Sequence, residues 1–245
     1  MVKQLATTFL GLGLIVSPLA TADILGAGAS VGYWYPGVSG YAALGDDRVD
    51  VEDDLDLESD GSVNLTAALE HPLPLIPNVR LGFSRLEHTG TGDTVQSYGD
   101  LIATGSVRSD LEVDQFDVTL YYELLDNWVN LDAGLTARML DASLTLEDRN
   151  TPQNVERTEV DVILPMLYAA ARFDVPVTDV SVGLEGHGIA FDGDSLMDIT
   201  AYGQYDLAVL RLRAGYRQLS LDVNEGNDTL DISIGGPFLS AGLDF

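Results

Sequence analysis

The last sixteen residues of the chain, 230–245, read LDISIGGPFLSAGLDF, and their pattern decides the fold. From position 239 onward, apolar residues alternate with small or polar ones, the apolar set being Leu239, Ala241, Leu243 and Phe245. A period of two is that of a β-strand with one apolar face. Before Gly235-Gly236-Pro237 the apolar residues stand one position out of phase, at Leu230, Ile232 and Ile234. A shift of one residue within a strand predicts a β-bulge, which glycine permits.

The same alternation recurs along the rest of the chain, in segments separated by short turns and longer polar loops. Ten segments are counted, at residues 24–40, 63–69, 79–83, 116–122, 129–137, 160–170, 180–188, 197–205, 210–216 and 230–245. Single-chain bacterial barrels have an even number of strands, each about 9 to 11 residues where it crosses the bilayer. The sequence therefore predicts an all-β fold: a transmembrane antiparallel up-and-down β-barrel of ten strands, with eight or twelve strands as alternatives.

A soluble lipocalin-like barrel has the same period of two, with its apolar face inside. The residues on the face opposite the apolar one therefore distinguish a membrane barrel from a soluble one. On that opposite face, charged residues gather with glycine and tyrosine, which indicates a polar lining and an apolar exterior. Residues 160–170 carry the longest apolar face, and we expect this face to contact lipid. Pro165 stands on the other, inward phase and predicts a bulge.

The first 22 residues have the composition of a secretory signal peptide. Lys3 precedes an apolar run at 9–16, and Ala20-Thr21-Ala22 forms an A-x-A cleavage site. That run is too short to span a bilayer, and no later run approaches 18 apolar residues. We expect a cleaved signal peptide over 1–22, a barrel domain over 23–245, and location in the outer membrane of a Gram-negative bacterium.

Charge and cysteine content exclude several classes of function. The formal net charge of the chain is −27, which argues against nucleic-acid binding, since such proteins carry a basic surface. The chain has no cysteine, so it has neither disulfides nor thiolate metal sites.

Several stretches carry a resemblance to known families. The final strand, with Phe245 as its last residue, resembles the terminal strand of bacterial outer-membrane barrels, which implies that Phe245 is the signal recognised by the barrel-insertion machinery. The stretches GASVGYWYPGVSG (28–40), EHPLPLIPNVRLGF (70–83) and ISIGGPFLSAGLDF (232–245) resemble a family of small proteobacterial outer-membrane β-barrel proteins with a Gly-Gly pair near the C-terminus. This resemblance implies fold and location, and the family has no established activity.

Charged residues on the inward phase form the main candidate site. Arg211, Arg213 and Arg217 share one phase of one segment, and we expect them to meet acidic residues from other segments in the lumen, namely Asp117, Asp161, Glu185 and Asp198. One interpretation is an ion-pair network that fills a narrow barrel; the other is a selectivity patch in an anion-preferring pore. Ten strands are closer to the filled eight-stranded case than to the wide porins, which favours the filled lumen.

A rim-site hydrolase is the alternative function. Outer-membrane enzymes such as the omptin proteases and lipid A deacylases place a histidine beside Asp, Glu or Ser near the rim of the barrel. Here His187 stands two residues after Glu185 and close in sequence to Asp194, and a carboxylate beside histidine suits general-base chemistry.

The stretch 46–60 holds nine acidic residues and is a candidate loop for divalent cations, which would bridge it to lipopolysaccharide phosphates. The candidate ligands are Asp46, Asp47, Asp50, Glu52, Asp53 and Asp54. The stretch lacks the glycine-punctuated spacing of a calcium loop, so a solvated acidic loop is the alternative.

The sequence therefore predicts a non-enzymatic integral outer-membrane barrel. Its type is structural or a narrow, porin-like pore for small solutes, with a charged network in the lumen and with no cofactor or metal. Its expected partners are outer-membrane lipid, lipopolysaccharide and the insertion machinery, without nucleic acid, and the barrel is expected to be a monomer.

Overall fold

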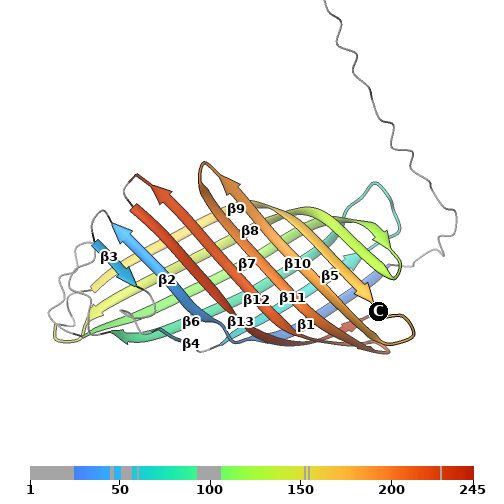
Figure 1. Ribbon diagram of the computed structural model, residues 1–245, viewed down its shortest axis with the longest axis horizontal. Coiled ribbons are helices and arrows are strands. Elements are labelled where there is room, and N and C mark those ends of the chain that lie inside the picture. The colour runs from blue at the N-terminus through green and yellow to red at the C-terminus, as the bar shows by residue number, and fades with distance from the viewer. Residues whose placement is uncertain are drawn as a thin grey trace, which may run out of the picture.

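A computed structural model describes residues 25–44, 47–50, 57–59, 61–92, 106–151, 153, 155–226 and 228–245 (Figure 1). The signal peptide predicted over 1–22 lies outside them. The strands are β1 (Gly26–Trp34), β2 (Gly37–Leu44), β3 (Asp47–Asp50), β4 (Leu57–Ser59), β5 (Ser62–Glu70), β6 (Asn78–Gly92), β7 (Val107–Asp126), β8 (Val129–Asp148), β9 (Val155–Asp174), β10 (Val180–Phe191), β11 (Asp194–Leu207), β12 (Leu210–Glu225) and β13 (Asp228–Asp244).

Ten of the described strands close into an antiparallel ring. The order is β1-β5-β6-β7-β8-β9-β10-β11-β12-β13, and β13 pairs back with β1. At the far end of the barrel β2 continues β1 along β13 and pairs with β3, and β4 pairs with β6. The predicted ten-stranded up-and-down barrel is thus confirmed.

The register of pairing around the ring sets the tilt of the strands. A row of paired residues that starts at Ala27 of β1 passes through Leu167 of β9 and reaches Ser39 of β2. The row therefore returns twelve residues farther along the same wall. Such a stagger tilts the strands by about 40° to the barrel axis, and the slanted arrows in Figure 1 show this tilt.

One half of the barrel has an apolar exterior. On the outside of β8, β9 and β13, Leu135, Leu167 and Leu239 are 63%, 70% and 68% exposed. The outward apolar positions of β8 run from Leu131 to Met139, which at about 3.3 Å per residue and a tilt of about 40° gives a band roughly 23 Å tall. That height matches the apolar band of outer-membrane barrels. No helix among the described residues is long and apolar enough to cross a membrane.

The other half of the barrel has the two faces exchanged. On β7 the outward residues Arg108 and Asp114 form ion pairs on the surface, while Val107 is fully buried inside. An apolar cluster fills the interior here: Trp34, Val38, Leu86, Val107, Leu146 and Ile234 are buried, and Val113, Leu144, Leu219, Ile232 and Phe238 pack against them. The strands are longer than the sequence predicts. β7, β8 and β9 have 20 residues each, whereas the predicted segments are 116–122, 129–137 and 160–170.

The structure overturns the lipid-facing assignment of residues 160–170, because the assigned face points into the barrel. Met166 and Tyr168 on this face are buried inside the barrel, while Ile163 and Leu167 on the opposite face are exposed. Pro165 lies on the outward face, not the inward one, and β8 pairs with β9 through Pro165 without a shift of register. The predicted bulge is therefore absent. β10 pairs with β9 only as far as Leu167, so Pro165 lies beyond the last of those pairs.

The bulge predicted at Gly235-Gly236-Pro237 is also absent. The register of β13 with β12 is continuous from Leu243 to Asp228, so even-numbered residues point inward throughout. The apolar residues change from even-numbered to odd-numbered positions at Gly235-Gly236-Pro237 because the interior of the barrel changes from apolar to polar at this level. Gly236 serves close packing instead, since a Cβ there would overlap the carbonyl oxygen of Tyr35, and its own carbonyl accepts a hydrogen bond from Trp34 Nε1 at 3.2 Å.

Candidate functional site

The lumen of the apolar-exterior half contains a polar cavity of about 890 Å³. It opens at the terminal end of the barrel, where β1 begins and β13 ends, because residues of that rim line it, among them Gly26, His71, Asp126 and Phe245. Figure 1 shows the C-terminus at this end. The opposite end, where β6 ends and β7 begins, is called the distal end.

Four charged side chains, called the ionic lattice, cross the lumen at the inner end of the cavity: Arg138, Arg217, Asp117 and Asp198. Arg138 is only 1% exposed and donates to both oxygens of Asp117 at 2.9 and 2.8 Å and to Asp198 at 2.8 Å. Arg217 donates to both oxygens of Asp198 at 2.9 and 2.7 Å. Charged groups this deeply buried are stable only as paired sets, so the four act as one unit.

Neutral groups complete the ionic lattice. Gln115 donates to Asp117 at 2.9 Å and accepts from Arg217 at 3.3 Å, and Arg217 also reaches Asn64 at 3.2 Å. The guanidinium of Arg217 lies 4.6 Å from the ring centroid of Trp34. Because Trp34 also belongs to the apolar cluster, the lattice and the cluster are in direct contact.

A second ion pair lies nearer the terminal end. Arg80 of β6 contacts Glu185 of β10 at 2.6 Å, with the rings of Tyr121 and Tyr168 within 6 Å of its guanidinium. His187 lies beside this pair, with Nε2 at 3.8 Å from Glu185.

Arg213 of β12 is held differently from the other lumen arginines. Its Nε donates to Gln204 at 2.7 Å, and its guanidinium lies 4.4 Å from the ring centroid of Tyr202. Within the described part of the chain Arg213 forms no ion pair, whereas Arg211 pairs with Asp244.

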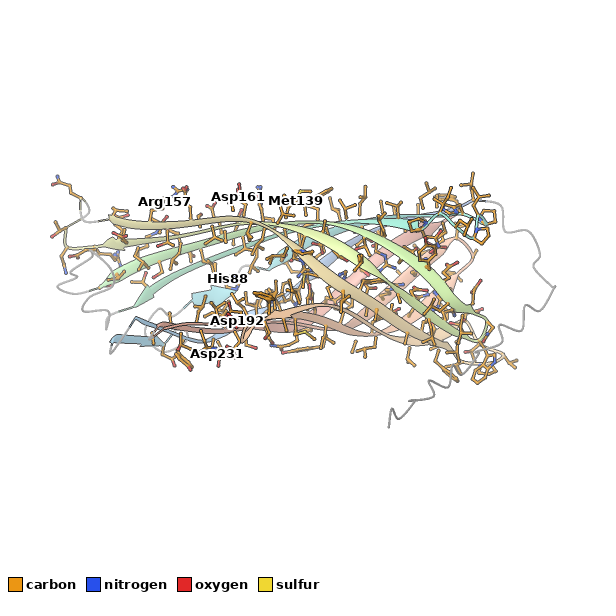
Figure 2. The ribbon with its side chains drawn as sticks, turned by 90° about the horizontal axis from the view of Figure 1, so that it is seen from above. His88, Met139, Arg157, Asp161, Asp192 and Asp231 are labelled. Carbon is orange, nitrogen blue, oxygen red and sulfur yellow. The ribbon has the colours of Figure 1, made fainter. Side chains whose placement is uncertain are left out.

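The structure brings six of the seven predicted network residues into the lumen, where they line the one cavity: Asp117, Glu185, Asp198, Arg211, Arg213 and Arg217. Asp161 is the exception. It is exposed on the outer surface of β9, where its side chain projects away from the barrel (Figure 2), because the faces exchange before this level. It pairs across the strands with Asp141 of β8.

Sequence reasoning missed Arg138 and Arg80, the central partners of the two buried sets. Both stand on the inward phase of their strands, opposite outward apolar neighbours such as Leu135 and Leu81. The alternation along each strand was therefore the signal in the sequence that could have identified these two arginines as lumen residues. It does not reveal that Arg138 meets Asp198, which comes from a strand that is not adjacent.

Of the residues of the hydrolase alternative, His187 and Glu185 are neighbours, but both have other partners, and Asp194 lies apart. His187 Nδ1 is 2.9 Å from the hydroxyl oxygen of Thr136, and Glu185 is held by Arg80. Asp194 begins β11, paired with Phe191, and accepts a hydrogen bond from the amide of Asn224 at 2.9 Å. His187 is paired with Asp198, four residues farther along β11, so Asp194 is about 13 Å away along the strand.

The acidic candidate loop is mostly outside the described residues, which exclude Asp46, Glu52, Asp53 and Asp54. Asp47 and Asp50 are the ends of β3. No group of three or more His, Asp or Glu side chains suited to a metal ion occurs in the described ranges.

Phe245, the predicted insertion signal, forms two backbone hydrogen bonds with β1. Its amide donates to the carbonyl of Ala27 at 2.8 Å, and its carbonyl accepts from the amide of Ala27 at 3.0 Å. Its ring is exposed on the outside of the barrel. Its role in insertion stays a prediction.

Comparison with solved structures places this fold among outer-membrane proteins. The outer-membrane protease OmpT of Escherichia coli matches with a TM-score of 0.55 at 11% identity, over 92% of this chain and 97% of that one. Weaker matches are the attachment invasion locus protein Ail of Yersinia pestis (TM-score 0.40, 13% identity, 90% of this chain and 99% of that one) and the translocator domain of the autotransporter NalP of Neisseria meningitidis (TM-score 0.41, 13% identity, 90% and 88%). No protein-family model and no curated protein matches the sequence. At this identity the likeness shows the fold alone, and with its lipid-facing apolar band the chain is an integral ten-stranded β-barrel of the outer-membrane type.

Proposed function

We propose that this protein is a closed, non-conducting structural barrel of the outer membrane. Its terminal end faces the periplasm, as the chain ends and short turns of such barrels do, and its distal half stands above the membrane.

The observation that carries this proposal is the contact between the ionic lattice and the apolar cluster. The lattice spans the lumen from β7 and β8 to β11 and β12, and Trp34 joins it to the cluster beyond. An ion that passed this level would leave water for a packed apolar interior, and moving a charge into such a medium costs many kcal/mol.

A narrow pore for small solutes is the competing function. It draws support from the polar cavity, which is wide enough to hold water and small solutes. It requires a continuous polar route to the distal end, and Leu86 and Ile234 of the apolar cluster stand in that direction.

Single-channel recording in planar bilayers tests the closed state. We expect no stable conductance steps from the purified wild-type barrel. The triple variant Trp34→Ala/Leu86→Ala/Ile234→Ala, which removes bulk from the cluster, should give small regular steps. Arg213→Ala is the matched control, because Arg213 lies in the cavity on the terminal side of the lattice and its loss leaves the closure in place.

The wild-type recording alone decides the proposal. Stable steps from wild-type protein, in a preparation whose folding is verified by heat-modifiable gel mobility, would overturn the closed barrel in favour of the pore. Silence of the triple variant, if it is folded, would mean that a different part of the lumen forms the barrier.

We further propose that the barrel has no hydrolytic activity. His187 and Glu185 are already engaged with Thr136 and Arg80, and Asp194 is too distant to orient the imidazole. Wild type and His187→Ala should give equal, background rates with lipid A and peptide substrates; a rate that depends on His187 would reject this.

The proposed partners follow from the surface. The apolar band contacts lipid, the surface charge of the distal half lies at the level of lipopolysaccharide, and β13 with Phe245 is the element offered to the insertion machinery. We propose a monomer that does not bind nucleic acid, in keeping with the net charge of −27.

A further inference from the structure

The periplasm-facing cavity has an acidic wall on one side and, across the lumen, an arginine without a direct ion pair among the described residues. In the ring of ten strands β12 is the fifth neighbour of β7 in either direction, so β7 and β12 face each other across the lumen. The cavity is lined on the β5, β7 and β8 side by an acidic wall, composed of Glu70, Glu123, Asp126 and Asp132, and on the β12 side by Arg211 and Arg213.

The four carboxylates of the acidic wall have no direct ion-pair partner among the described residues, although Arg80 and Arg172 line the same side of the cavity. Within the same described ranges Glu70 receives only the hydroxyl hydrogen bond of Tyr121 at 2.7 Å. The carboxylates come from three strands and line one cavity, so they repel one another. A cationic group between them would relieve that repulsion.

Arg213 on the opposite wall is held in a fixed position and has no direct ion pair among the described residues. Gln204 and the ring of Tyr202 hold its guanidinium in place, and Gln204 stands between Arg213 and Asp206, to which its amide donates at 3.0 and 2.8 Å. Arg211 next to it is paired with Asp244, so Arg213 is the arginine of this wall that has no carboxylate in direct contact. A guanidinium fixed in this way presents its remaining donors to a carboxylate without further loss of side-chain freedom.

The cavity has the size of a ligand site. Its volume of about 890 Å³ falls in the range of small-molecule pockets. The wall formed by β1 points Gly26, Gly28, Ser30 and Gly32 inward, which leaves the space between the charged walls free of bulky side chains. The ionic lattice ends the cavity, so a ligand enters and leaves from the periplasm.

We propose that this cavity binds a small zwitterion, a molecule with a carboxylate and an ammonium group such as a short peptide, with the carboxylate against Arg213 and the ammonium group against the acidic wall. A simple anion would bring no cation to the acidic wall, and a simple cation would bring no carboxylate to Arg213. A ligand with both charges can contact the acidic wall and the remaining donors of Arg213 at the same time, and a tripeptide spans about 10 Å when extended. The inference goes beyond the closed structural barrel and does not depend on conductance.

Isothermal titration calorimetry on the folded full-length barrel in detergent micelles tests the proposal with three matched probes. Triglycine carries both charges, N-acetyltriglycine lacks the cation, and triglycinamide lacks the anion. We expect triglycine to bind and each capped probe to bind at least about tenfold more weakly. Equal affinity of all three probes, or no binding of triglycine up to about 10 mM, would overturn the proposal.

Variants assign each charge to its wall. Arg213→Gln should weaken triglycine and N-acetyltriglycine and leave triglycinamide unchanged, and Arg213→Lys should restore part of the loss. Asp132→Asn should weaken triglycine and triglycinamide and leave N-acetyltriglycine unchanged. Arg85→Gln is the control, because Arg85 pairs with Asp114 on the outer surface. An equal effect of Arg213→Gln on all three probes would contradict the assignment.

Tryptophan emission gives a second readout that places the ligand. The chain has two tryptophans, and Trp34 lines the cavity whereas Trp128 lies exposed on the outside. In a Trp128→Phe background, triglycine should change the emission of Trp34 over the same concentration range as the calorimetric signal. Heat of binding without any change at Trp34 would place the peptide outside the cavity and would reject the site.

Discussion

At the scale of single residues, Arg138 shows how a charge is kept inside a membrane barrel. Its guanidinium connects the β7 carboxylate Asp117 with the β11 carboxylate Asp198 while its own side chain is almost wholly buried. Buried ion pairs of this kind are weak net contributors to stability as a whole, but removal of one partner leaves the others as uncompensated charges.

Arg138→Met should therefore destabilise the barrel by about 3–5 kcal/mol, because Asp117 loses its ion-pair partner and Asp198 keeps only Arg217. Urea unfolding of the barrel in lipid vesicles measures the change. Arg157→Met is the matched control: Arg157 pairs with Glu159 on the exposed surface, where ion pairs contribute little. Equal loss of stability in the two variants would show that the ionic lattice is not what the fold depends on.

Gly236 is the second residue whose identity is set by its surroundings. Gly236→Ala should lower the yield of folded barrel, since a Cβ would overlap the carbonyl of Tyr35 where β13 meets β1 and β2. Gly203→Ala on the outside of β11 should fold normally, because a Cβ there would meet no atom nearer than the carbonyl oxygen of Ala214 at 4.0 Å. Heat-modifiable gel mobility after refolding gives the folded fraction of each. Normal folding of Gly236→Ala would mean that the two strands separate at little cost.

At the scale of single elements, β9 carries the boundary between membrane and water along one face. The outward positions Phe173, Leu167 and Ile163 are apolar, and Asp161, Glu159 and Arg157 follow them toward the distal end. Figure 2 shows Asp161 and Arg157 projecting from the outer surface. The apolar band thus ends between Ile163 and Asp161.

A matched pair of substitutions on this strand locates the boundary. Leu167→Lys places a charge in the lipid-facing band and should cost about 2–4 kcal/mol. Asp161→Lys lies on the same face beyond the band and should change stability little. Urea unfolding in lipid vesicles measures both. A cost for Asp161→Lys as large as that for Leu167→Lys would move the membrane boundary toward the distal end.

At the scale of the whole molecule, one set of strands builds two halves of the barrel whose apolar side chains point in opposite directions. The terminal half has lipid outside and a polar cavity inside, and the distal half has charges outside and the apolar cluster inside. This inversion follows from the solvent, because an apolar side chain turns to lipid within the membrane and to the interior where the outside is water.

Cysteine labelling on intact cells tests the resulting orientation, and the chain has no cysteine of its own to label. Glu159→Cys, exposed on the distal half, should react with a membrane-impermeant maleimide on intact cells. Val177→Cys, fully exposed in the turn between β9 and β10, should react only after the outer membrane is opened. The reverse pattern would invert the barrel in the membrane.

The alternation of the sequence by itself determined the strand type, the count of ten and the apolar exterior near the terminal end, because a period of two requires only that the two faces meet different surroundings. It also placed Arg211, Arg213 and Arg217 on one phase. The period does not say which face is inside: the apolar face assigned at residues 160–170 points inward, and at 230–234 the apolar residues lie inside the barrel instead of outside. Only the tertiary structure decided this, because the choice depends on whether a given level of the barrel is surrounded by lipid or by water. Ring closure likewise decided that Arg138 meets Asp198 and that Asp161 stays outside, since contacts across a lumen depend on strand order and stagger, which no single strand encodes.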